Sequence, residues 1–163
     1  MEDAPAIAGV HVRSWQAAYR GLLPDGLLAR LSVSEREAMW REAAGGRAGP
    51  GALFVAEREG RVLGFCALSE PTRDEDEPEG VAELGAIYID PQAWRSGAGT
   101  ELMKVALAHL RSAGWREVTL WVLQTNQPAL DFYARFGFVS DGARRIYEPS
   151  GSTGIRLRRA LES

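Results

Sequence analysis

The sequence is poor in the residues that form disulfides and metal sites. Its 163 residues include one cysteine, Cys66, which excludes an intrachain disulfide framework and a cysteine-based metal cluster. The two histidines, His11 and His109, do not recur at ligand spacing, so we expect no metal. A single free thiol is typical of a reducing compartment. We interpret Cys66 as a buried strand residue rather than a nucleophile, because no histidine lies near it in the sequence.

Long apolar runs and an excess of positive charge are also missing. No apolar stretch approaches the roughly 20 residues that cross a bilayer. The first ten residues, MEDAPAIAGV, lack the basic and apolar regions of a signal peptide. The 19 Lys and Arg residues are outnumbered by 22 Asp and Glu residues, which argues against nucleic acid as the main partner. We therefore expect a cytoplasmic protein with no membrane or nucleic-acid partner.

What is present fits one globular domain over residues 1–163, because the chain is 45% hydrophobic and has no internal repeat. Apolar residues at helical spacing predict helices over 3–19 and 33–44, with Asp3 and Ser34 as N-caps. This part of the chain also predicts inward-facing Met39 and Trp40, a turn over 20–28 and a loop over 45–51.

The remaining patterns alternate between strands and helices. Helices separate the later strands and a hairpin at Gly60 joins the first two, which indicates an α/β (α+β) fold. We expect a mixed, mostly antiparallel sheet of about six to seven strands with helices on both faces. The predicted strands cover 52–59, 61–70, 81–89, 117–123, 138–148 and 153–161, and the helices cover 98–113 and 128–136. The inward face of the first of these helices would carry Leu102, Ala106, Leu110 and Ala113.

Two glycines, Gly97 and Gly99, stand where the strand over 81–89 gives way to the next helix. The first N–H groups of a helix have no internal acceptors and favour an anion. Glycines there let a phosphate approach the backbone, and Arg95 adds a positive charge. A tight turn without a ligand is the alternative. Neither a P-loop nor a dinucleotide fingerprint fits, because no Lys precedes Thr100 and Leu102 replaces the third glycine.

Four stretches resemble the GNAT superfamily of N-acetyltransferases, and together they extend over nearly the whole chain. The family signature, Gln/Arg-x-x-Gly-x-Gly/Ala, corresponds to Trp94–Gly99, where Trp94 departs from the pattern. ELGAIYIDP (83–91) is similar to the family's fourth strand, and NQPALDFYARFGF (126–138) to its Asn-x-x-Ala-x-x-Phe-Tyr segment. HVRSWQAAYRGLLP (11–24) resembles its first-helix region. Family members usually have a strand before that helix, and this chain begins almost at the helix.

The resemblance implies a GNAT-like fold that binds acetyl-CoA and acetylates an amine. Glu83 would be the general base, and strand alternation would place it on one face with Gly85, Ile87 and Ile89 unless a bulge intervenes. A solvated glutamate at the strand end is the alternative. Tyr133 would be the general acid that protonates the departing thiolate, or else an amphipathic core tyrosine.

The resemblance also implies the cofactor contacts. Backbone groups near Ile87 and Ile89 would bind the pantetheine where two strands splay apart, and the signature would bind the pyrophosphate. Asn126 would bind the cofactor arm, or simply cap the helix that follows. The candidate cofactor-binding residues are Ile87, Tyr88, Ile89, Trp94, Arg95, Ser96, Gly97, Ala98, Gly99, Thr100, Asn126 and Tyr133.

The acceptor remains open between a polyamine, an aminoglycoside-like amine, an amino acid and a protein N-terminus. In the family the first-helix region walls the acceptor pocket, which here would use Trp15, Tyr19, Leu22 and Leu23. The acidic loop over 72–80 either attracts a cationic substrate or is a solvated loop. His11 either faces this pocket or is an ordinary helix residue, and we interpret His109 as half-exposed on its helix. A homodimer is possible, and a non-catalytic acyl-CoA-binding module is the alternative function.

Overall fold

The computed structural model describes residues 2–44 and 51–162, so the predicted loop over 45–51 lies, except for Gly51, outside the described residues. Six strands form one sheet in the order β1-β2-β3-β4-β6-β5, with β3 and β4 parallel and all other pairs antiparallel. The predicted mixed, mostly antiparallel sheet is therefore confirmed. The strands are β1 (Leu53–Arg58), β2 (Arg61–Ser69), β3 (Val81–Ile89), β4 (Glu117–Leu123), β5 (Val139–Tyr147) and β6 (Ser152–Ala160).

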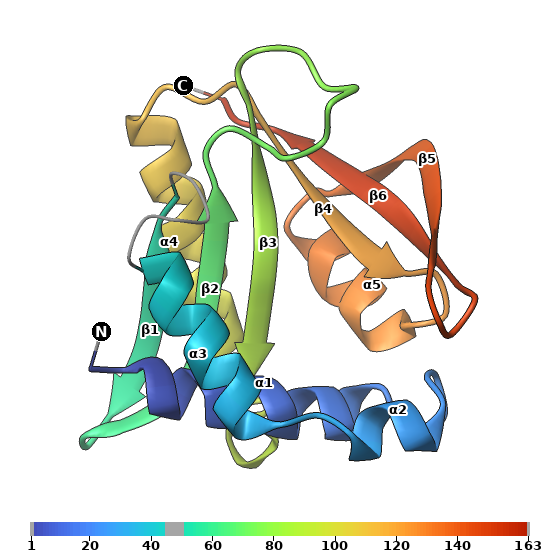
Figure 1. Ribbon diagram of the computed structural model, residues 1–163. Helices are drawn as coiled ribbons and strands as arrows, with labels where there is room; N and C mark the ends of the chain where they lie inside the picture. Colours follow the sequence, from blue (N-terminus) through green and yellow to red (C-terminus); the bar gives the residue numbers. More distant parts are fainter. Residues whose placement is uncertain (1, 45–50, 163) are drawn as a thin grey trace.

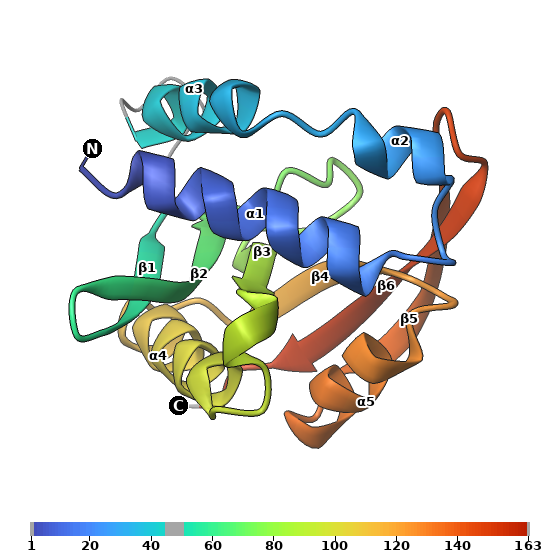
Figure 2. The same cartoon turned by 90° about the horizontal axis from the view of Figure 1, so that it is seen from below.

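Helices cover both faces of the sheet, as predicted (Figures 1 and 2). On one face α1 and α3 form a core with β1, β2 and β3 around Phe65, Ile7 and Trp40. On the other face α4 and α5 pack on β2, β3, β4 and β6 around Met103 and Leu120. The helices are α1 (Ala4–Ala18), α2 (Asp25–Ala29), α3 (Val33–Ala44), α4 (Ala98–Ser112) and α5 (Gln127–Arg135), and η1 (Pro91–Ala93) is a 3₁₀ turn.

The parallel pair β3–β4 is short. Register runs only from Val81 opposite Glu117 to Glu83 opposite Thr119. Beyond this point β4 keeps β6 on one side and β3 keeps β2 on the other, and the two strands diverge (Figure 1). The backbone groups of the second half of β3 therefore face away from any strand on the β4 side, where an extended ligand can pair with them.

Asp3 is the N-cap residue of α1, as predicted, although its side chain makes no capping hydrogen bond. Three other local predictions are wrong. Ser32 rather than Ser34 caps α3, because its hydroxyl accepts from the Glu35 N–H at 3.3 Å. The stretch predicted as a turn over 20–28 includes most of α2, a single helical turn. Met39 is 37% exposed although its neighbour Trp40 is buried.

The inward face of α4 is largely as predicted, with Leu102, Ala106 and Leu110 buried. Ala113 is exposed, since α4 ends at Ser112 and Ala113 serves as its C-cap. No helix within residues 2–44 and 51–162 is both long enough and apolar enough to cross a membrane.

Candidate acetyl-CoA and acceptor sites

The start of α4 leaves backbone donors open. Gly97 is its N-cap and has a left-handed backbone, φ 90°. A β-carbon added to Gly97 would meet no atom within 4 Å, so it would enter the open space in front of the helix. The Ala98 N–H donates to the Ser96 hydroxyl at 3.4 Å, and those of Gly99 and Thr100 lie in the first turn, where a helix supplies no acceptor. Arg95 lies beside them and is exposed, so these donors are free to bind an anion from outside the chain.

Gly99 differs from Gly97 because protein atoms surround it. A β-carbon there would lie 3.5 Å from Ile89 and 3.6 Å from the Phe132 ring, which are ordinary van der Waals distances. A methyl group would therefore fit at this position, in agreement with the Gly/Ala choice of the family signature.

Trp94, which departs from the family signature, has a definite role in the structure. Its indole N–H donates to the Ile89 carbonyl at 2.9 Å, while 47% of the residue remains exposed. The bond ties the turn before α4 to the last residue of β3. The Ile89 carbonyl, a predicted pantetheine contact, therefore already accepts one hydrogen bond from within the chain.

A β-bulge in β3 overturns one prediction about Glu83. Ala86 pairs with Ala67, but Leu84 pairs with Leu68, so Gly85 is an extra residue. Leu84 packs on the α4 face together with Ile87 and Ile89. Glu83 therefore points to the opposite face, the one that Ala86 and Tyr88 share with α1 and α3.

Glu83 is buried, with 5% of its surface exposed, so its interpretation as a solvated strand-end residue is wrong. Its carboxylate accepts from the Arg73 backbone N–H at 3.2 Å and from the Arg73 guanidinium at 3.3 and 3.4 Å. The Thr72 hydroxyl donates to it at 3.4 Å. The loop after β2 thus holds this carboxylate at the position where β3 and β4 separate.

Tyr133 lies on α5, the helix that follows β4. It is half-buried and packs on the α4 side of the sheet, with its ring edge-on to Phe138 at 5.9 Å between centroids. Burial raises the pKa of the Tyr133 hydroxyl, which stays protonated at neutral pH. Asn126 caps α5, because its side-chain oxygen accepts from the Ala129 N–H at 3.4 Å. The capping interpretation of Asn126 is therefore confirmed.

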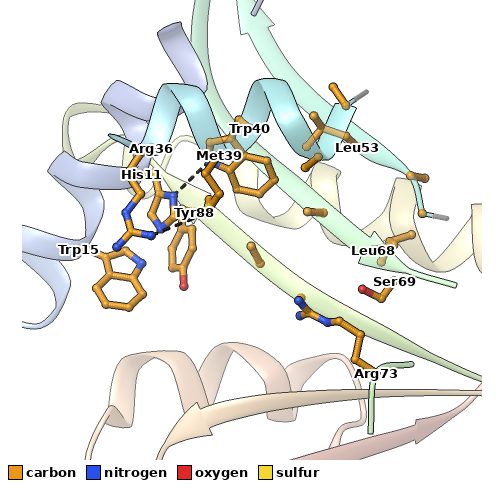
Figure 3. A pocket seen from close by; sticks show the side chains of 17 residues that line it. His11, Trp15, Arg36, Met39, Trp40, Leu53, Leu68, Ser69, Arg73 and Tyr88 are labelled. Atoms are coloured by element: carbon orange, nitrogen blue, oxygen red, sulfur yellow. Dashed lines mark hydrogen bonds between the residues drawn. The ribbon is translucent and has the colours of Figure 1, made fainter. Parts of the chain in front are cut away.

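A cavity of about 660 Å³ opens between α1, α3 and the sheet, on the face that carries Glu83 (Figure 3). Aromatic side chains make much of its wall, including Trp15, Trp40 and Tyr88. Arg36 of α3 and Arg73 of the β2–β3 loop bring positive charge to it from two sides. Gly85 and Ala86 also line it, so the cavity reaches the bulge in β3.

Only part of the predicted acceptor wall borders this cavity. Of the four predicted residues only Trp15 lines it. Tyr19 packs edge-on against Trp15 with ring centroids 4.9 Å apart but does not line the cavity, and neither do Leu22 and Leu23 in the connection from α1 to α2. Sequence spacing could not exclude them, since where a connection lies is decided by tertiary packing.

His11 is a buried wall residue of the same cavity. Its Nδ1 accepts from the Trp40 indole N–H at 3.1 Å, and its ring stacks on Tyr88 at 5.2 Å. Burial, with a smaller effect of Arg36, lowers the pKa of His11 to about 4, so the ring is neutral at pH 7. Of the two interpretations of His11, an ordinary helix residue or one that faces the acceptor pocket, the structure shows a buried helix residue that lines this cavity.

Cys66 is fully buried, as predicted, and burial raises its pKa to about 12, which makes it a poor nucleophile.

The His109 side chain is 36% exposed, as the half-exposed interpretation predicted. It lies 2.8 Å from the Glu70 carboxylate, and this carboxylate also accepts a hydrogen bond from the Trp115 indole N–H. These contacts tie the end of β2 to α4. Residues 2–44 and 51–162 contain no cluster of His, Cys, Asp and Glu arranged to hold a metal ion.

The acidic loop over 72–80 is neither free to attract a cation nor simply solvated. Arg156 of β6, which is buried, forms ion pairs with four carboxylates at 2.7 to 3.3 Å. Arg158 pairs with Glu77, whose side chain is 2% exposed. The loop is therefore clamped to β6 by two arginines that the sequence pattern did not connect with it. The partners of Arg156 are Asp74, Asp76, Glu77 and Asp141.

A sheet whose parallel pair splays beside the open amides at the start of a helix is the arrangement that the resemblance implies for an acyl-CoA-dependent acyltransferase. The sequence profile described as "Acetyltransferase (GNAT) family" matches residues 13–138. The "uncharacterized N-acetyltransferase YuaI" of Bacillus subtilis (strain 168) is 32% identical over 97% of this chain and 85% of its own length. A mycothiol acetyltransferase of Thermomonospora curvata is 34% identical over 61% of this chain, which spans only 31% of that protein.

Solved structures have the same fold. The PaiA N-acetyltransferase of Thermoplasma acidophilum, in complex with coenzyme A, superposes with a TM-score of 0.75 over 98% of this chain and 93% of its own, at 20% identity. The ribosomal-protein-alanine N-acetyltransferase of Brucella melitensis gives a TM-score of 0.75 at 20% identity, over 98% of this chain and 95% of its own. The chain belongs to the GNAT family of acetyltransferases. It is an acetyl-CoA-dependent N-acetyltransferase, as the sequence analysis predicted.

Proposed function

We propose that residues 1–163 form one domain that binds acetyl-CoA between β3 and β4 and transfers its acetyl group to a primary amine in the cavity under α1 and α3. The observation that carries this proposal is the opening of the sheet after Glu83, with the donor-rich start of α4 on one side and the aromatic cavity on the other.

The residues at the start of α4 fit the pyrophosphate of coenzyme A. The amides of Gly99 and Thr100 offer hydrogen bonds, and the left-handed Gly97 keeps β-carbon bulk away from them. The backbone of β3 from Ile87 to Ile89 faces the splay and can pair with the amides of the pantetheine arm. When bound, acetyl-CoA supplies the activated acetyl group.

The overall transfer converts an amine and acetyl-CoA into an acetamide and coenzyme A. A C–N bond forms, the C–S bond breaks, one amine proton leaves and one proton is delivered to the sulfur. Glu83 is placed to accept the amine proton, directly or through water, because it faces the cavity side of β3. Tyr133 holds its proton and lies on the α4 and α5 side of the splay, where the thiolate departs.

Coenzyme binding and turnover can be tested separately. Coenzyme A should raise the melting temperature of the protein, whereas ATP and NAD at the same concentration should raise it much less. Thiol release from acetyl-CoA in the presence of an amine panel then tests the transfer. Coenzyme binding without thiol release from any amine would favour the non-catalytic acyl-CoA-binding module.

We place the enzyme in the cytoplasm on the evidence of its single buried thiol. If it forms a homodimer, the edge strand β5 is the surface that favours one. Its Val139 and Ile146 are 66% and 57% exposed.

A further inference from the structure

We propose that the acceptor is a free amino acid with an apolar or aromatic side chain, whose carboxylate binds Arg73. This rests on the proposed function and adds to it the chemical class of the amine. The cavity on the Glu83 side of the sheet holds the ligand, with its amino group at the bulge of β3 and its side chain against the aromatic wall (Figure 3).

The charge of the cavity favours an anionic group. Its lining includes the two arginines Arg36 and Arg73, and no Asp or Glu is among the lining residues in the part of the chain that the structure describes. His11, which also lines it, is neutral at pH 7 and adds no charge of its own. Even when the buried Glu83 carboxylate that pairs with Arg73 is counted, Arg36 leaves the cavity with one excess positive charge, which disfavours polyamines and favours carboxylates.

Arg73 has hydrogen-bonding capacity to spare. Its Nε and Nη2 contact Glu83 at 3.3 to 3.4 Å, and its Nη1 has no partner among residues 2–44 and 51–162. The side chain is 67% exposed, and Nη2 lies 3.2 Å from where a β-carbon of Gly85 would be. The guanidinium therefore lies over the bulge residue itself, with donors left for a second carboxylate.

The position of Arg73 determines which amine can react. In an α-amino acid the amino group and the carboxylate share one carbon, so a carboxylate bound at Arg73 brings the amine to the bulge. Glu83 lies two residues before Gly85 and is held by the same Arg73, so it is close to that amine. The side chain then extends toward Trp15 and Tyr88, which offer an apolar surface.

Arg36 lines the cavity on the side opposite Arg73, where its positive charge repels a cationic ligand. Arg36 is half-buried on α3, and within residues 2–44 and 51–162 its side chain makes a single weak hydrogen bond, to the Met39 sulfur at 3.7 Å. No salt bridge neutralises it among the described residues. Three carboxylates of the loop over 72–80, those of Asp74, Asp76 and Glu77, are paired with Arg156 and Arg158 instead.

The test compares ligands that differ only in the carboxylate. Calorimetric titration of the coenzyme A-saturated protein uses L-phenylalanine, L-phenylalaninamide and spermidine. The amide has the same shape as phenylalanine and represents a protein N-terminus. We expect phenylalanine to bind at least about 10-fold more tightly than its amide, since a charged hydrogen bond is lost. Spermidine should bind no better than the amide.

Two variants locate the effect. Arg73→Gln should bring the phenylalanine-to-amide affinity ratio close to 1 while the affinity of the amide stays the same. Arg41→Gln is the matched control, because Arg41 lies on α3, pairs with Glu37 and does not line the cavity. Equal or tighter binding of the amide or of spermidine, or no binding of phenylalanine, would overturn the inference. Failure of coenzyme A to saturate the protein would instead count against the proposed function.

Discussion

The Arg73 guanidinium lies 3.3 Å from the Glu83 carboxylate and joins the loop after β2 to the position where β3 leaves β4. Glu83 is therefore held in place on the cavity side of the sheet. Replacing it with Gln keeps the shape of the side chain and removes the basic oxygen. We expect Glu83→Gln to lower kcat/KM by about 10²-fold, as for other general bases, with an unchanged Kd for coenzyme A. Glu75→Gln, in the exposed part of the same loop, is the control and should have no effect.

Tyr133→Phe removes one hydroxyl and leaves the packing of α5 on the sheet unchanged. If this hydroxyl protonates the departing thiolate, kcat should fall by about 10- to 10²-fold while the KM for acetyl-CoA stays nearly the same. Steady-state kinetics and a melting curve measure both effects. Unchanged turnover in a folded variant would show that Tyr133 is a core tyrosine without a catalytic role.

Gly97→Ala tests the anion site, because the new methyl group enters the space in front of α4. The matched control is Gly114→Ala just beyond the other end of α4. Gly114 also has a left-handed φ, 84° against 90° at Gly97, and also has no atom within 4 Å of an added β-carbon. Both variants should lose about 1–2 kcal/mol of folding free energy. Only Gly97→Ala should weaken coenzyme A binding, by about 10-fold, and equal affinities in the two variants would argue against the site.

Arg156→Ala tests the clamp on the acidic loop. The substitution leaves the buried Glu77 and its acidic neighbours without their common partner, so the free energy of unfolding should fall by about 3 kcal/mol. Arg145→Ala on the neighbouring strand is the control. Arg145 is exposed and stacks on Trp121 at 4.3 Å, and its loss should cost less than about 1 kcal/mol. Urea unfolding measures both, and equal losses would show that the ion pairs are not the cause.

His11 should make stability depend on pH between about 4 and 6.5. Burial lowers the pKa of His11 to about 4 in the fold, against 6.5 for an exposed histidine, so the unfolded chain takes up its proton first as the pH falls. The contribution of the neutral His11 ring to the free energy of unfolding is fully present above pH 6.5. It falls as the pH decreases toward 4, by up to about 3 kcal/mol. Asp90 and Asp141 have lowered pKa values and act below this window, under about pH 4. The free energies of unfolding of wild type and His11→Gln should converge from pH 7 to pH 4.5, and parallel pH profiles would contradict this.

Regular patterns made most of the fold predictable. The strands over 81–89 and 117–123 and the helix over 33–44 have the predicted bounds, because alternating or helical apolar spacing is a local property. The hairpin at Gly60 was also predictable from a local signal, a glycine between two strand patterns. Glycine readily adopts the positive φ that the turn requires, and φ is 77° at Gly60. The signature glycines correctly marked the start of α4.

What the sequence did not reveal depends on pairing between distant segments. The bulge at Gly85 moves Glu83 to the opposite face, and nothing in the local alternation marks it, because a bulge is set by the register with β2. Arg156 reaches Asp76 across 80 positions of sequence, so the acidic run could not be read as half of a clamp. Arg73 is the one basic residue within the acidic loop over 72–80, and only the fold places it beside Glu83.

The most direct test of the account is the crystal structure of the protein with coenzyme A. We predict that the pyrophosphate lies within hydrogen-bonding distance of the Gly99 and Thr100 amides, the pantetheine arm between β3 and β4, and the sulfur on the Tyr133 side of the splay. A coenzyme bound elsewhere, or a pyrophosphate without contact to the start of α4, would contradict it.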